Sequence, residues 1–413
     1  MKLLTFLGVA AYKETIYVWQ NQEFSTRFAP AATCHFLRPD TLTVFLTEEA
    51  EEKIFPQLRA SLPQRLTVNP IPVSLGQDEK ELWHIFDQVS GSVEDNETVA
   101  FDITHGLRSF PLIGLLVAAY LRTAKQVSLK AVLYGAYDVG QQVSPGRTPI
   151  FDLTPMITLL EWATAADRFN RTGDSRYLAA LVKALRKEQA LAAQSDPEQL
   201  EQIGRLANLA GALTAISQSL RLIRPRLAMT QAHGLEERVS MAKPSLERAL
   251  AARPFSLVLD SVVKSYQPLA LPDPDQPEQA RETLRVERKI INWYAEREQW
   301  AQAITLAREW LVSWIMLQLG MNNLLETGAR QRVEGVIGSE AASYLEAEKN
   351  KRTFTPLFLD KLPNGGQVIA FWLSLSDLRN DIDHAGMRLD PGKPEDLIKK
   401  IKIAIDFLNN LQI

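Results

Sequence analysis

The pattern of apolar residues changes near residue 155, and this change constrains the fold more than any other feature of the sequence. Before that point, short apolar runs alternate with helical stretches, which is typical of a mostly parallel sheet flanked by helices. After it, strand signals nearly vanish and helical periodicity continues to the C-terminus. We therefore expect an α/β domain over residues 1–157 and an all-α region over residues 158–413.

The expected elements follow from the same periodicity. Strands that are apolar on both faces indicate a sheet that is covered on both sides. The expected strands are residues 2–8, 42–47, 66–73, 98–103, 128–135 and 150–153. The expected helices are residues 48–61, 78–90, 110–124, 155–172, 176–193, 197–223, 232–251, 278–298, 300–320, 336–350 and 366–380. A Pro-rich loop at 267–280 interrupts the helical half, and a helical hairpin is expected to turn near Glu298.

Composition narrows the class of protein. A chain of 413 residues predicts two or three domains, and its net charge of −3 argues against a generally basic nucleic-acid coat while leaving room for a local basic groove. The single cysteine, Cys34, excludes a disulfide framework or a Cys-rich zinc site and fits a reducing compartment.

The longest apolar run, 110–121, is too short to span a bilayer, and the N-terminal run is typical of a buried strand. We expect a cytoplasmic protein.

The segment VAFDITHGLRSFP at 99–111 carries the main candidate site of the first half. It predicts a buried strand, a turn, and a helix with Ser109 as N-cap and Pro111 in the first turn. This order places the turn at the carboxyl edge of a parallel sheet, where open α/β folds bind ligands. The candidate ligand-binding residues, which offer donors or close backbone approach to an anion, are Thr104, His105, Gly106, Arg108 and Ser109.

Other strand ends add candidates to the same edge. They are Gly8, Val9 and Ala10 after the first strand, Thr47 after the second, and Tyr134 and Gly135 in a later one. The sequence has no GxGxxG and no GxxxxGK[ST], so a dinucleotide site or a P-loop is not supported. From composition alone, an ordinary βα loop before a capped helix is the better explanation of 99–111. The following helix is apolar nearly all round, so we expect it to be buried against both its sheet and a second subunit.

The segment SDLRNDIDHAG at 376–386 carries the candidate site of the second half. Arg379, Asn380 and His384 are its candidate catalytic residues, although on this spacing alone a solvated helix end is the better explanation. Residues five apart on a helix lie about 140° out of register, so one pair does not form a compact site. Asp381 and Asp383 suggest a metal site with His384, but consecutive helical residues do not converge on one ion, and we expect no metal.

A second pair, Arg226 and His233, matches an equally permissive spacing. It follows Pro225 and lacks the asparagine, so we interpret it as a chance match.

Several motifs together resemble a known family. FLGVAAY, DITHGLRSFP, YGAYD and FDLTPMITLLEWATAADRF, over residues 1 to about 170, are similar to CARF-domain proteins of type III CRISPR systems. The resemblance implies a Rossmann-like, dimeric sensor of cyclic oligoadenylate, a ring whose two-fold symmetry fits a dimer axis. It implies phosphate and ribose contacts from residues 104–109, and adenine contacts from residues 8–10 and 134–135.

The same family often carries a helical HEPN ribonuclease domain with an R-x4–6-H motif, which Arg379-Asn380-…-His384 matches. The resemblance implies a metal-independent endoribonuclease in which the RNA 2′-OH attacks phosphorus and leaves a 2′,3′-cyclic phosphate. A histidine suits the proton transfers and an arginine suits the charge at phosphorus. Asn380 would orient the histidine or the phosphate. Two copies across a dimer would supply a composite cleft.

We therefore expect a cyclic-oligoadenylate-activated endoribonuclease of type III CRISPR defence that cleaves single-stranded RNA. It would act as a homodimer or a higher oligomer of dimers, with cyclic tetra-adenylate favoured as activator over cyclic hexa-adenylate and no cofactor. The helical stretch between about 190 and 330 exceeds a minimal HEPN bundle and reads as dimer contact or linker. Two alternatives stay open: a CARF-containing transcription factor, for which 219–226 (SLRLIRPR) is the only local basic run noted, and a ring nuclease acting at Thr104, His105 and Arg108.

Overall fold

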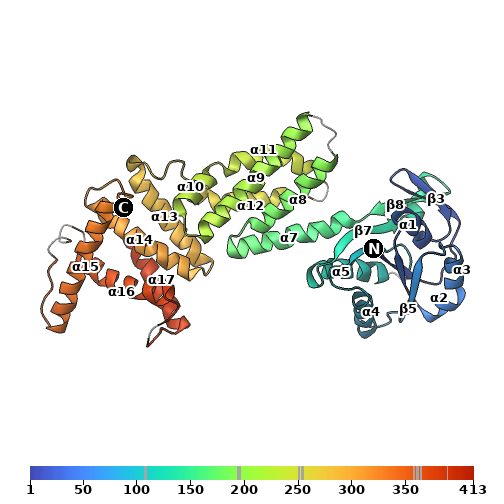
Figure 1. The fold of residues 1–413 in the computed structure, drawn as a ribbon, viewed down its shortest axis with the longest axis horizontal. Helices are drawn as coiled ribbons and strands as arrows, with labels where there is room; N and C mark the ends of the chain where they lie inside the picture. Colours follow the sequence, from blue (N-terminus) through green and yellow to red (C-terminus); the bar gives the residue numbers. More distant parts are fainter. Residues whose placement is uncertain are drawn as a thin grey trace. The chain divides into compact units, whose positions relative to one another are not determined.

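The structure, a computed structural model, divides into two compact units, Met1–Glu161 and Trp162–Ile413 (Figure 1). It describes every residue except 107–108, 193–196, 250–251, 253–254, 357–358, 360–361, 363–364 and 388, and the side chains of 192, 256 and 257. The predicted succession of an α/β region and an all-α region is confirmed.

The first unit is built on an eight-stranded sheet of order β3-β2-β8-β7-β6-β1-β4-β5. Its five central and edge strands run parallel, as the apolar runs predicted: β1 (Lys2–Leu7), β4 (Thr41–Leu46), β5 (Thr67–Pro72), β6 (Thr98–Asp102) and β7 (Ser128–Gly135). Strand β8 (Arg147–Asp152) is antiparallel to β7. The chain runs from β1 to β4 and β5 on one side and then to β6 and β7 on the other. The strand order therefore reverses between β1 and β6, which is where such sheets bind ligands.

A β-hairpin was missing from the sequence prediction. Strands β2 (Thr15–Trp19) and β3 (Gln22–Thr26) pair antiparallel and extend the sheet beyond β8. Their two-residue turn, Gln20 and Asn21, has φ angles of 47° and 65°. Positive φ at both central residues makes the type of turn that matches strand twist, and an asparagine there is a usable signal.

Helices cover both faces of the sheet because successive residues of a strand point to opposite sides. Leu3 and Leu7 of β1 join one core with α1 (Ala29–Leu37), while Leu4 and Phe6 join the other. Helices α2 (Glu48–Lys53) and α3 (Phe55–Ala60) add to the first core, α4 (Glu79–Gly91) and α5 (Ser109–Ala124) form part of the second, and α6 (Tyr137–Val143) precedes β8.

The outer side of α5 stays exposed in the single chain. Leu112, Leu116 and Tyr120 are about half exposed and line an apolar groove with Trp83 and Phe86 of α4. The second layer that the sequence predicted over this helix is therefore not supplied by the described residues of this chain.

The second unit consists of helices (Figure 1). They are α7 (Thr154–Thr172), within which the division falls, α8 (Arg176–Ala192), α9 (Pro197–Arg221), α10 (Pro225–His233), α11 (Leu235–Arg248), α12 (Phe255–Tyr266), α13 (Ala280–Glu296), α14 (Trp300–Gln318), α15 (Thr327–Lys349), α16 (Gly365–Asp383) and α17 (Pro394–Asn410). The predicted Pro-rich connection separates α12 from α13.

The prediction for this unit needs three corrections. Residues 232–251 are not one helix, because α10 and α11 meet at Gly234, and α12 and α17 were missed. The apolar positions Ile401, Ile405 and Leu408 of α17 recur at helical spacing and are buried, so this helix could have been found. The predicted hairpin is confirmed, since α13 and α14 meet around Glu298.

The polar atoms of two buried aromatic residues in the second unit form hydrogen bonds with backbone carbonyls. Trp310 Nε1 donates to the Leu284 carbonyl at 2.8 Å, and the Tyr294 hydroxyl donates to the Leu220 carbonyl at 2.6 Å. These bonds tie α14 to α13 and α13 to the end of α9. Large rings with a satisfied polar handle fix helix positions as well as filling space.

Candidate functional site

Two glycines bring the loops after β1 and β6 into contact at the carboxyl edge of the first unit's sheet. A Cβ placed on Gly8 would lie 3.3 Å from the Gly106 Cα, so the two backbones touch. Gly106 has a φ of 113°, and a Cβ there would lie 2.9 Å from the Phe110 ring. Gly106 therefore requires glycine, Gly8 leaves little room for a side chain, and the structure brings these two predicted residues together at the point where strand order reverses.

Polar contacts join the loop after β6 to the end of β7. The Asp102 carboxylate, which is fully buried, accepts from the Thr104 N–H at 3.0 Å and from the Thr5 hydroxyl at 3.1 Å. Burial raises the pKa of Asp102, and hydrogen bonds from Thr104 and Thr5 oppose that rise. The Thr104 hydroxyl in turn accepts from the Gly135 N–H at 2.8 Å. Two more predicted residues, Thr104 and Gly135, are thus adjacent.

His105 is packed rather than open. Its Nε2 accepts from the Ala29 N–H, in the first turn of α1, at 3.0 Å, which assigns the proton of the neutral ring to Nδ1. Its ring packs on Tyr12 with centroids 4.5 Å apart, and the Tyr12 hydroxyl donates to the Gly8 carbonyl at 2.7 Å. Burial lowers the pKa of His105 to about 4. At neutral pH His105 is therefore an uncharged residue that holds this loop against α1.

The His105 packing predicts a pH dependence of stability. The folded-state pKa lies below the ordinary value of 6.5, so the unfolded chain binds the proton more readily. The stability contributed above pH 6.5 is lost as pH falls towards about 4. We expect His105→Gln, whose amide oxygen can still accept from Ala29, to make stability less pH-dependent over this interval. Labelling of the buried Cys34 thiol in α1, compared between the two proteins at each pH, measures it; identical profiles would contradict it.

The other predicted ligand residues lie at or near the same edge. Val9 and Ala10 are exposed, and Tyr134 is 39% exposed at the end of β7. Thr47 is buried and caps α2, its hydroxyl accepting from the Ala50 N–H at 3.4 Å. Helix α5 begins at Ser109, the predicted N-cap. Arg108 lies outside the described residues. The ligand roles of the whole set remain predictions.

In the second unit, Arg379 is held by a chain of polar contacts. Its Nε lies 2.8 Å from Asp383 Oδ2, one turn further along α16, and its Nη1 donates to Asn380 Oδ1 at 3.2 Å. The other Asp383 oxygen accepts from the Thr305 hydroxyl of α14 at 3.1 Å. Arg379 is thus fixed through Nε while its side chain stays about one-third exposed. The sequence analysis missed Thr305, because nothing in the chain order places α14 beside this motif.

His384 follows the last residue of α16 and is exposed. The helix ends in a left-handed turn: Ala385 has a φ of 54°, and the Gly386 N–H donates to the Asp381 carbonyl at 2.8 Å. The His384 side chain makes no hydrogen bond or ion pair with a residue that the structure describes. The exposed imidazole at this helix end is therefore accessible to a bound substrate.

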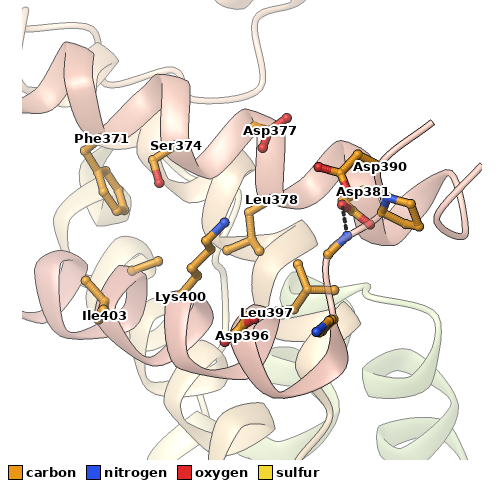
Figure 2. A pocket seen from close by; sticks show the side chains of 14 residues that line it. Phe371, Ser374, Asp377, Leu378, Asp381, Asp390, Asp396, Leu397, Lys400 and Ile403 are labelled. Atoms are coloured by element: carbon orange, nitrogen blue, oxygen red, sulfur yellow. Dashed lines mark hydrogen bonds between the residues drawn. The ribbon is translucent and has the colours of Figure 1, made fainter. Parts of the chain in front are cut away.

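A cavity of about 570 Å³ lies between α16 and α17 (Figure 2). Asp377 and Asp381 from α16 face Asp396 and Lys400 from α17 across it, and Asp381 accepts from the Gly392 N–H at 3.0 Å. Its α16 residues lie on the side of that helix away from Arg379 and Asp383, and its described lining includes neither Arg379 nor His384. The acidic residue Asp381 therefore braces the loop after α16 and belongs to a different surface.

In the alternative pair, Arg226 and His233, the arginine has a structural role. Arg226 lies 3.3 Å from Glu287 and 3.0 Å from Asp275 and is largely buried. Its guanidinium therefore ties α10 to α13, which supports interpreting Arg226 and His233 as a chance match.

Comparison with known proteins gives a match that lies mostly in the second unit. Residues 158–269 match the family described as "CRISPR-associated protein MJ1674, second domain". This segment begins in α7 and reaches the loop after α12. It makes up 112 of the 413 residues, so this part of the chain is similar to a domain of a CRISPR-associated protein, in line with the predicted resemblance.

One curated relative carries this name. The CRISPR-associated protein MJ1674 of Methanocaldococcus jannaschii is 30% identical over 158 residues, which make up 38% of this chain and 23% of the relative. The aligned part thus spans less than a quarter of the relative. Among solved structures, Enterococcus italicus Csm6 bound to cyclic hexa-2′-fluoro-hexa-dAMP is similar, with a TM-score of 0.44, 10% identity, and coverage of 98% of this chain and 92% of that one.

The described part of the chain contains neither a candidate membrane span nor a cluster of metal-ligating side chains. No helix there is both long and apolar enough to cross a membrane. No group of three or more His, Cys, Asp or Glu side chains within the described ranges is arranged to hold a metal ion.

Proposed function

We propose that this protein is a cyclic-oligoadenylate-activated endoribonuclease that cleaves single-stranded RNA without a metal in CRISPR defence. The observation that carries the proposal is the end of α16, where Arg379 is fixed by Asp383 and the neighbouring His384 is exposed. The relationship to CRISPR-associated proteins supports it. So does the predicted ligand edge, where glycine contacts join the loops of the first unit.

In the proposed reaction, the RNA 2′-OH attacks the adjacent phosphorus and the 5′-oxygen leaves. His384 exchanges protons with the reacting oxygens, since its exposed imidazole is accessible to a bound substrate and can both donate and accept a proton. Arg379 keeps its charge and donates to the phosphorane oxygens through the atoms that Asp383 does not use. Two copies, one from each subunit of a homodimer, supply an acid and a base together. The products are a 2′,3′-cyclic phosphate and a free 5′-hydroxyl.

Activation is proposed to begin at the sheet edge of the first unit. A cyclic oligoadenylate bound across two such edges contacts the loops after β1, β6 and β7 and favours the arrangement in which the paired Arg379/His384 sites are competent. This requires two distinct sites and two states of the dimer. The exposed apolar side of α5 gives the dimer a surface to bury.

Cleavage of a fluorescent single-stranded RNA in EDTA tests the proposal. We expect cleavage only when cyclic tetra-adenylate or cyclic hexa-adenylate is added, and the ring that works gives the activator size. Absence of cleavage with either ring would overturn it.

The Thr305 contact predicts a graded effect on the same reaction. Thr305→Val keeps the shape but removes the donor to Asp383, so Arg379 is less well oriented. We expect kcat to fall about tenfold, the size of one hydrogen bond to a charged group, with KM little changed. Thr305→Ser should restore most of the rate, and Thr230→Val, which removes a hydroxyl bond within α10, should not change it. Equal rates for the valine and serine variants at position 305 would contradict this role.

A further inference from the structure

A small basic cavity opens on the second unit, outside the candidate site described above. It has a volume of about 250 Å³, and residues from the end of α7, the start of α8, the end of α9 and the helices α13 and α14 around their connecting turn line it. Arg168, Arg176 and Arg221 line it, together with one carboxylate, Asp174. Three guanidinium groups around one carboxylate leave an excess of two positive charges in a protein whose net charge is −3.

The wall of the cavity is rigid. The Ser175 and Ser217 hydroxyls lie 2.8 Å apart, and the Tyr266 hydroxyl donates to the Gly173 carbonyl at 2.7 Å. Gly173 has a φ of 67°, and a Cβ there would lie 2.1 Å from the Trp293 ring. The turn between α7 and α8 is therefore fixed in place, and the arginines are carried on a preorganised surface.

The three arginines differ in the interactions that their guanidinium groups already make within the protein. Arg176 is paired with Asp174; burial raises the pKa of this carboxyl, but the hydrogen bonds from Arg176 outweigh it and leave the pKa below its ordinary value. Arg168 lies over the Tyr177 ring, 4.7 Å from its centroid, and Arg221 ends α9. Neither Arg168 nor Arg221 forms an ion pair with a described residue. Two charged donors therefore remain for an anionic ligand, beside an exposed tyrosine ring.

The cavity shares helix α14 with the contacts that hold Arg379. Gln302 of α14 lines it, and Thr305, three residues further along the same helix, donates to Asp383, the partner of Arg379. Three residues span about 4.5 Å along a helix axis and lie on neighbouring parts of one face. Helix α14 therefore connects the lining of the cavity to the residues that hold Arg379.

We propose that this cavity binds the phosphate backbone of the single-stranded RNA substrate, through Arg168 and Arg221, outside the site where the reacting phosphate lies. The inference rests on the proposed function. The proposal gives Arg221, in the basic run 219–226, a role in RNA binding. Arg226 of the same run forms ion pairs with Asp275 and Glu287 within the unit. Tyr177 offers a face on which a base can stack, as in other single-strand binders.

The test uses the double variant Arg168→Gln/Arg221→Gln of the full chain. We expect its KM for a fluorescent single-stranded RNA to rise about tenfold with kcat little changed, because the subsite binds ground state and transition state alike. The same substitutions in His384→Ala, followed by anisotropy without cleavage, should lower the slope of log affinity against log salt by about 1.4, or 0.7 for each lost phosphate contact. Arg205→Gln, sixteen residues before Arg221 on α9, is the matched control and should change neither.

Each result decides between the proposals. An unchanged KM and salt slope in a protein that cleaves RNA would overturn the subsite alone. RNA binding that depends on Arg168 and Arg221 in a protein that never cleaves would support the subsite and overturn the ribonuclease. A shift only in the activator concentration needed would assign the cavity to the cyclic nucleotide, and failure of every version to bind RNA would overturn both proposals.

Discussion

His384→Ala is expected to abolish activator-dependent RNA cleavage, lowering kcat by about 10³-fold while the chain stays folded. The loss follows from the proposed proton transfers, since a positioned acid or base contributes about 10² to 10⁴ in rate and each dimer loses both copies. His384 is exposed, and its side chain makes no hydrogen bond or ion pair with a residue that the structure describes, so stability should not change. Single-turnover cleavage of a fluorescent single-stranded RNA in EDTA, with saturating cyclic oligoadenylate, measures the effect.

The chain offers a matched control for this substitution. His233 also ends a helix, is exposed, and follows an arginine at a permissive spacing. His233→Ala should leave the rate unchanged, whereas equal losses in the two variants would show that the assay reports something other than the α16 site.

Any cleavage of the cyclic oligoadenylate itself should survive in His384→Ala, because it would occur in the first unit. Full RNA cleavage by His384→Ala would refute the proposed catalytic role.

Gly173→Ala is expected to destabilise the second unit by about 2–4 kcal/mol. The added methyl would overlap the Trp293 ring, which is itself 94% buried, and the alanine would have to keep a φ of 67°. Overpacking of a buried ring costs about 1–3 kcal/mol and a left-handed non-glycine residue adds about 1 kcal/mol. Guanidinium denaturation followed by tryptophan fluorescence measures the change in the free energy of unfolding.

Gly211→Ala is the control for this effect and should act in the opposite direction. Gly211 lies inside α9, and a Cβ there meets no atom within 4 Å, so alanine should stabilise the helix by about 1 kcal/mol. If Gly173→Ala were as stable as the wild type, the turn between α7 and α8 would have to be free to move away from Trp293. The preorganised wall of the basic cavity would then lose its support.

Local patterns were sufficient for much of the first unit. The buried strands, the turn at Gly106 and the parallel order could be predicted because apolar periodicity and glycine placement are properties of neighbouring residues. The hairpin β2–β3 was missed because its strands are short and half-exposed, so its pattern is weak. The state of His105 could not be predicted from the sequence, which shows only that an imidazole is present. The packing against Tyr12 and the hydrogen bond from Ala29 show that its ring is neutral and that its Nε2 already has a partner.

The sequence by itself determined the two-part architecture, the carboxyl-edge loops of the first unit and the Arg379–His384 motif at a helix end, because each depends on residues within one turn or one strand. Only the tertiary structure decided that Thr305 supports Asp383 and Arg379, and that Arg168, Arg176 and Arg221 surround one cavity. Thr305 lies 78 residues before Asp383, and Arg221 lies 45 residues after Arg176. Their proximity depends on how whole helices pack, through many weak apolar contacts that no short segment encodes.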